Sequence, residues 1–127
     1  MTLLERYQHM VTLAIEEYPL LASDTEAIAL ADIGRDAVAC YTSGMGYVPL
    51  AQYRAADALL RAVAERVGMP HATLLDSTLR MLGHEFSKIQ ATGHAQGGGP
   101  REAEGCADNF VMALRHVGIA LAERAGG

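Results

Sequence analysis

Hydrophobic residues recur every three or four positions along most of this chain, which is the spacing of one face of an α-helix. Proline and glycine interrupt the pattern at four places and divide it into five segments. The sequence therefore predicts an all-α fold, a single compact bundle of about five helices, mostly antiparallel, over residues 1–127. The helices are expected near residues 2–18, 23–43, 49–67, 70–92 and 100–125, with a flexible glycine-rich linker at 93–99.

Residues that favour helix ends stand at several of these boundaries. Thr2 and Glu5 have the spacing of a capping box, and the segment 23–26 (Ser-Asp-Thr-Glu) repeats that spacing. Pro19 is expected to end the first helix, and Gly68 is expected to end the third as a left-handed cap.

The inward stripe of the second helix contains the small residues Ala27, Ala31 and Gly34. A glycine inside a helix costs about 1 kcal/mol relative to alanine, so Gly34 needs a physical reason. We expect these small residues to let another helix approach closely. A groove that holds a ligand is the alternative, and a helical-bundle enzyme or ligand carrier would then have a site around Gly34, Tyr41 and His71.

Composition and charge narrow the class of protein. Of 127 residues half are apolar and a fifth are charged, which suits one globular domain. The net charge is −5, and residues 1–47, with seven acids and two bases, carry all of it. We expect no basic field for nucleic acid and no membrane partner. Cys40 and Cys106 are expected to be reduced, mostly buried thiols, and the chain to be cytoplasmic, because the N-terminus lacks the features of a signal peptide.

Motifs for catalysis or metal binding are incomplete. His84-Glu85 begins like the helix of a zinc protease, but Lys88 stands where the second histidine ligand would have to be. The other histidines lack ligand spacing, and no serine or cysteine has a recognisable base nearby in sequence. We therefore predict no enzymatic activity, no metal and no cofactor.

The last helix is apolar on two sides. One face is a regular inward stripe, made of Phe110, Ala113, Leu114, Val117 and Leu121. Met112 and Ile119 lie on the opposite side, beside Asp108, Arg115 and Glu123. Such a helix is either central to its own bundle or covered by a partner. We favour a small non-enzymatic protein-binding regulator, inhibitor or adaptor, with Met112, Ile119, Arg115 and Asp108 as its interface and a homodimer as one form of it.

A second class of function comes from the corner between the third and fourth helices. In this segment Ala64 is a small residue, Gly68 stands at the turn, Met69 is the apolar residue after it, and Leu74 is the inward residue of the second helix. With this pattern Val63–Leu79 resembles the helix-turn-helix motif of bacterial repressors. In that motif the second helix enters the major groove of DNA. The resemblance implies a DNA-binding regulator; the base-reading residues would be His71, Ala72, Thr73 and Asp76, with Arg80 near phosphate. An ordinary corner within a helical bundle fits the same segment.

Overall fold

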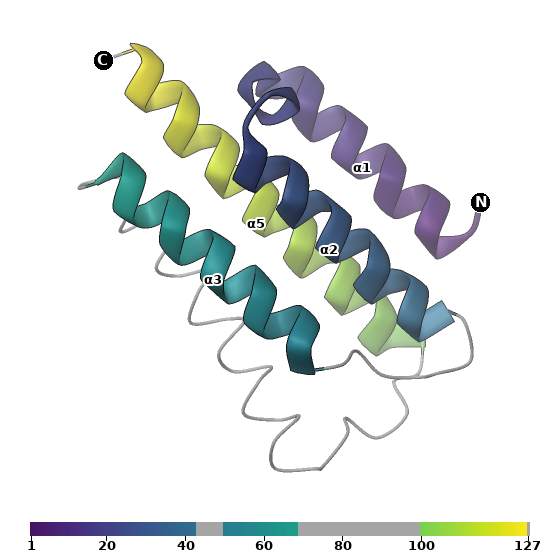
Figure 1. Cartoon of the computed structure of the whole chain (residues 1–127). Helices are drawn as coiled ribbons and strands as arrows, with labels where there is room; N and C mark the ends of the chain where they lie inside the picture. Colours follow the sequence, from purple (N-terminus) through teal and green to yellow (C-terminus); the bar gives the residue numbers. More distant parts are fainter. Residues whose placement is uncertain (43–49, 69–99, 127) are drawn as a thin grey trace.

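The computed structural model describes residues 1–42, 50–68 and 100–126 of the chain. These residues form four α-helices and one short 3₁₀ helix (Figure 1): α1 (Leu3–Glu17), η1 (Pro19–Ala22), α2 (Thr25–Thr42), α3 (Leu50–Val67) and α5 (Pro100–Gly126). The described part contains no strand, so the predicted all-α class is confirmed. The helix expected near 70–92 and the linker expected at 93–99 lie outside the described residues.

The first helix begins as its sequence predicts. The Glu5 backbone N–H donates to the Thr2 hydroxyl (3.1 Å), and the Thr2 N–H donates to the Glu5 carboxylate (3.3 Å). This reciprocal pair satisfies two of the donors that a helix start leaves without a helical acceptor. The helix ends at Glu17, two residues before Pro19.

The junction between α1 and α2 differs from the prediction in two ways. Pro19 opens η1, a turn that buries Leu21 in the core. The cap of α2 is Asp24 and not Ser23: the Ala27 N–H donates to the Asp24 carboxylate at 3.0 Å, while the Ser23 hydroxyl lies against the carbonyl of Leu20. The predicted box failed because Ser23 ends η1 with helical backbone angles (φ −117°, ψ −8°), whereas an N-cap residue is typically extended, which leaves the next residue to cap the helix.

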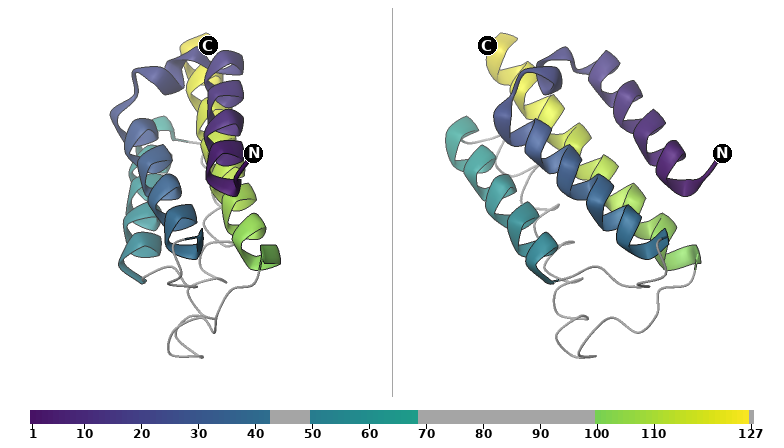
Figure 2. Two further views of the ribbon diagram at one scale, coloured as in Figure 1. Left: turned by 90° about the vertical axis from the view of Figure 1, so that its right-hand side faces the viewer. Right: turned by 45° about the vertical axis from the view of Figure 1, so that its right-hand side comes forward.

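The helices form two layers, α1 with α5 and α2 with α3 (Figure 2). Helix α5 packs most extensively against α2 and then against α1. Helix α2 runs antiparallel to the other three described helices (Figure 1). Among the described helices the pairs α1 with α2, α2 with α3 and α2 with α5 are antiparallel, as predicted, whereas α1 with α5 and α3 with α5 run parallel, because α5 begins at the end of the molecule at which α3 began.

The core lies where the inward stripes meet. All five predicted inward residues of α5 are buried, as are Tyr7 of α1 and Leu60 of α3. Leu13, whose position in the helical repeat places it on the outer side of α1, is 46% exposed. Sequence periodicity therefore identified the inner faces of these helices correctly.

Two glycines allow tyrosine side chains to pack closely against a neighbouring helix. The tyrosines are Tyr7 of α1 and Tyr18, the residue that follows α1. A Cβ atom on Gly34 would collide with the Tyr7 hydroxyl and would lie 3.0 Å from the Cβ of Phe110. A Cβ on Gly118 of α5 would lie 2.8 Å from the Cβ of Tyr18. The close-approach hypothesis for Gly34 is thus correct. The ligand alternative fails at this position, since Tyr7 and Phe110 fill the space.

The third helix ends at Gly68, whose φ of +69° is the left-handed conformation expected for a cap. Two residues earlier, the Arg66 guanidinium donates twice to the Asp24 carboxylate, at 2.6 and 3.1 Å. This ion pair joins the end of α3 to the start of α2. On the solvent side of the same helix, Arg61 and Asp57, four residues apart, form an ion pair with Nε and Oδ2 2.9 Å apart.

Candidate functional site

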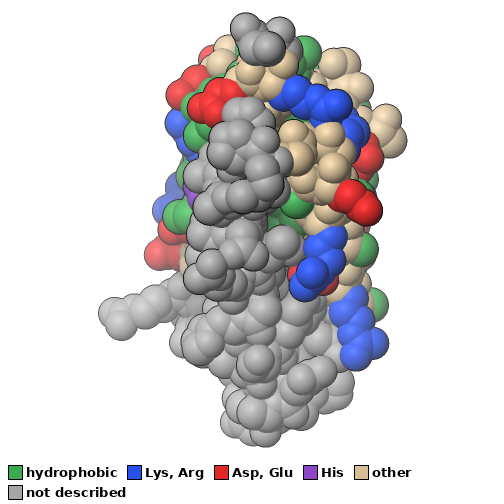
Figure 3. All heavy atoms as spheres, turned by 90° about the vertical axis from the view of Figure 1, so that its left-hand side faces the viewer, with side chains coloured by type: hydrophobic (Ala, Val, Ile, Leu, Met, Phe, Trp, Pro, Cys, Tyr) green, Lys and Arg blue, Asp and Glu red, His purple; other side chains and the backbone are tan. Residues whose placement is uncertain are grey.

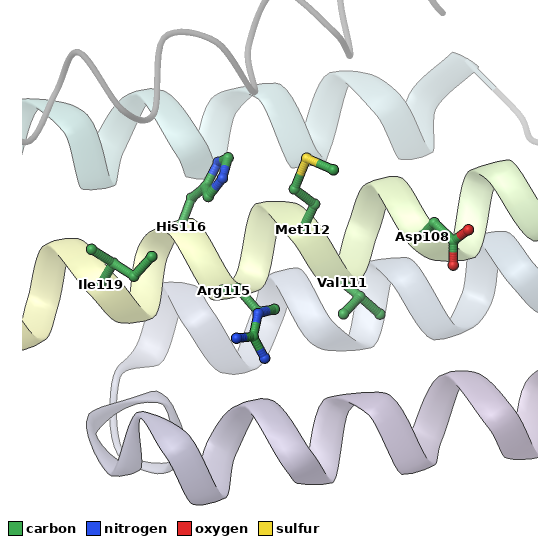
Figure 4. Close-up of a pocket in the computed structure, with 6 residues that line it drawn as sticks. All are labelled: Asp108, Val111, Met112, Arg115, His116 and Ile119. Carbon is green, nitrogen blue, oxygen red and sulfur yellow. The ribbon is translucent and has the colours of Figure 1, made fainter.

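The outer face of α5 carries a shallow hollow of about 340 Å³ (Figure 4). The described residues that line it belong to α5: Asp108, Val111, Met112, Arg115, His116 and Ile119. The structure therefore brings together the four residues that the sequence assigned to a protein interface. Val111 and His116 line the same hollow and were not predicted, because Val111 belongs by periodicity to the buried side of the helix.

Met112 is the most exposed apolar residue of this hollow, with 44% of its surface accessible. Ile119 is half-buried, and Val111 is buried at the border of the core. Met112 and Ile119 were both placed on the side opposite the inward stripe, and of the two Met112 is the more exposed. The apolar contact surface is centred on Met112, and Ile119 forms one end of it.

Arg115 is held in place by α1. Its Nη2 lies 2.6 Å from a carboxylate oxygen of Glu17, and its guanidinium carbon lies 5.8 Å from the centre of the Tyr18 ring. In Figure 4 the Arg115 side chain accordingly points toward α1, whereas Met112 and His116 point toward the side of α3. An ion pair together with a cation–π contact restricts an otherwise flexible side chain.

The hollow has opposite polarity at its two ends. Asp108 is exposed toward the start of the helix, and Arg115 and His116 both follow about two turns later. Burial lowers the pKa of His116 below its ordinary value of 6.5. The imidazole is therefore neutral at neutral pH, able to donate and to accept a hydrogen bond.

A second groove, between α1 and α2, was not anticipated from the sequence. Two adjoining hollows, of about 300 and 110 Å³, share Val11, Ala31 and Asp32. Ile28, 45% exposed, lines the larger one. The signal that could have found it is Ile28 itself, a large apolar residue off the inward stripe of its helix.

The residues of the DNA-binding alternative, His71, Ala72, Thr73, Asp76 and Arg80, lie outside the described residues. Gly68 adopts the conformation that both a helix-turn-helix and an ordinary helix cap require, so it does not discriminate between them. Figure 3, which views the molecule from the side of α3, shows acidic and basic side chains close together on the described part of this face. The DNA-binding hypothesis stays a prediction of the sequence.

The described residues also bear on metal binding, on membrane insertion and on the state of the two cysteines. Within residues 1–42, 50–68 and 100–126, no three His, Cys, Asp or Glu side chains are grouped so as to hold a metal ion. None of the described helices is long and apolar enough to cross a bilayer. Cys106 is buried in the core and Cys40 is half-buried, both as thiols.

Comparison with protein-family models, with curated proteins and with solved structures found no match to this chain.

Proposed function

We propose that this chain is a small non-enzymatic regulator, inhibitor or adaptor that binds another protein through the outer face of α5. We call this face the Met112 surface; it consists of the six residues that line the α5 hollow. The observation that carries the proposal is the exposure of Met112 at the middle of a hollow that has charged groups toward its ends. Removing such an apolar side chain from water favours association.

The chemistry of the surface suits contact with a protein. Methionine has a flexible, polarisable side chain that adapts to the shape of a partner. Arg115 is already fixed by Glu17 and Tyr18, so ordering it on binding costs little further conformational entropy. Asp108 lies on one side of Met112, and Arg115 and His116 lie on the other. The two ends of the surface therefore differ in charge, which favours one orientation of the partner.

The size of the hollow sets the expected strength. Complete burial of a methionine side chain contributes about 1.5–3 kcal/mol, and Met112 is already more than half buried. Its remaining surface therefore supplies on the order of 1 kcal/mol. A useful affinity requires that the partner also cover Ile119 and pair with the flanking charges, and the excess of acid in residues 1–47 favours a partner with basic surface.

The test is a comparative capture from an extract of the native host. The wild-type chain, the Met112→Glu/Ile119→Glu variant and a Leu13→Glu control are immobilised in equal amounts. Leu13 is as exposed as Met112 but lies on α1, so its substitution places a new carboxylate on another surface. Each recovered protein is then purified, and its affinity for the three chains is measured by titration calorimetry.

We expect a partner that binds the wild type and the Leu13→Glu control equally and the double variant at least about tenfold more weakly. A partner that binds all three chains alike would show that another surface is used. Failure to recover any partner, with all three chains folded by circular dichroism, would count against the protein-binding function itself.

A further inference from the structure

Three residues on the outer side of α5 follow one another at intervals of one helical turn. Asp108, Met112 and His116 are four residues apart and line the same hollow. The acidic group and the imidazole therefore lie about 6 Å along the helix axis on either side of the exposed methionine. This order has a consequence for contact with an identical helix.

A two-fold axis through Met112 makes the surface complementary to itself. In an antiparallel pair the two Met112 side chains meet at the axis, and Asp108 faces His116 of the partner subunit, once on each side. A parallel pair would instead place equal groups opposite each other. A two-fold interface repeats every favourable contact, so one carboxylate–imidazole pair counts twice.

The outer ends of the surface also match. Seven residues from Met112 in the two directions stand Gly105 and Ile119. A Cβ atom on Gly105 would meet nothing within 4 Å, so the space beside this residue is open. In the antiparallel pair, Ile119 lies over Gly105 of the partner subunit, where the missing side chain allows a helix to approach closely.

We propose that the partner of the Met112 surface is a second copy of this chain, bound antiparallel along α5 about an axis at Met112. This inference rests on the proposed function and names the partner of the same surface. The contact extends from residue 105 to residue 119, about 21 Å of helix. An interface of single helices of this length is small, so the dimer is weak and its population depends on concentration.

The test is sedimentation equilibrium of the purified full chain over a wide range of concentrations, in low salt and at neutral pH. The wild type and the Leu13→Arg control form a dimer with equal dissociation constants. Met112→Arg places two like charges at the axis and leaves a monomer. Asp108→Lys and His116→Asp each replace an attractive pair and each weaken the dimer at least about tenfold. Combining Asp108→Lys with His116→Asp recovers most of the affinity, because groups of opposite charge then face each other on both sides of the axis.

A wild-type chain that is monomeric at every concentration would overturn the dimer, and so would a double variant no tighter than its single parents. Should His116→Asp prevent folding, a Met112→Cys variant is used in its place. Mild oxidation is then expected to link two copies through position 112 faster than it links two copies of a Leu13→Cys control through position 13. The wild type, oxidised in the same way, measures the background from Cys40 and Cys106. Equal rates at the two positions would also overturn the dimer. A monomer whose Met112 surface still decides the capture of a different protein would refute the dimer and leave the proposed function standing.

Discussion

The ring of Tyr7 lies directly over Gly34, and its hydroxyl donates a hydrogen bond of 2.8 Å to the carbonyl of Ala31 in the same helix. A residue of α1 thus uses the space left by a glycine of α2 to reach a backbone acceptor. Tyr7 is only 1% exposed, so this contact is part of the core. It explains why a helix that is otherwise rich in alanine has a glycine in its middle.

Gly34→Ala is expected to destabilise the fold by on the order of 1–2 kcal/mol. Overpacking a core costs about 1–3 kcal/mol, and the better helix propensity of alanine returns up to about 1 kcal/mol. The measurement is urea unfolding followed by circular dichroism. Gly105→Ala is the matched control, since the same methyl group there meets open space and should stabilise the chain by up to about 1 kcal/mol. Equal effects at the two positions would contradict the packing described for Tyr7.

Alkaline pH tests the same tyrosine in another way. Burial raises the pKa of Tyr7 above its ordinary value of 10.0. The folded chain therefore holds the phenolic proton at pH values where the unfolded chain releases it, and stability falls as the pH rises above about 10. Tyr7→Phe should cost about 0.5–1.5 kcal/mol at pH 7 through loss of the hydrogen bond. It should also make the urea midpoint less sensitive to pH between about 9 and 11 than in the wild type; an unchanged slope would contradict the assignment.

Asp24 has two roles, the cap of α2 and the acceptor for Arg66. Asp24→Ala removes both and is expected to cost about 1–2 kcal/mol. Asp24→Asn keeps a capping oxygen and loses the charge, so it should cost less. Arg66→Ala removes only the ion pair, on the order of 0.5 kcal/mol, because the guanidinium is partly exposed. Thermal unfolding of the three variants in one buffer ranks these effects, and a larger loss for Arg66→Ala than for Asp24→Ala would contradict the ranking.

The loss of stability at acid pH depends on the same carboxylate of Asp24. Burial alone would raise the pKa of Asp24, but the hydrogen bonds from Arg66 and from the Ala27 N–H outweigh burial and hold the pKa below its usual range. The contribution of the charged form is therefore complete above the ordinary value of 3.8 and is lost as the pH falls through the lower value in the folded chain. Below about pH 4, Asp24→Asn should lose stability less steeply than the wild type; parallel curves for the two proteins would show that Asp24 does not contribute.

Features of the fold that depend on residues close together in the sequence could be predicted, whereas features that depend on residues far apart in the sequence could not. The cap at Thr2, the end of α3 at Gly68 and the inward stripe of α5 follow from residues within a few positions of each other, and all three are present. The choice of Asp24 over Ser23 was missed because it depends on competition with the preceding turn. Contacts between distant residues, such as Tyr18 with Gly118, leave no local pattern at all.

The same distinction applies to the candidate site. The exposed methionine and its charged neighbours share one helix, so helical periodicity was enough to assemble them. That Arg115 is fixed by Glu17, almost the whole chain away, could not be read from either segment alone. The groove between α1 and α2 needs both helices in place, which explains why it appeared only in the structure.

We propose that a protein partner covers the Met112 surface, and the methyl resonances of the methionines report directly on such a contact. The chain is labelled with ¹³C at the methionine methyl groups and assigned by single substitutions. Spectra are then recorded at increasing concentration and with the protein recovered by capture. We predict that the Met112 signal shifts or broadens as a complex forms, while the signal of Met10, half-buried on α1, stays where it is. A complex that forms while the Met112 signal remains unchanged would contradict the account.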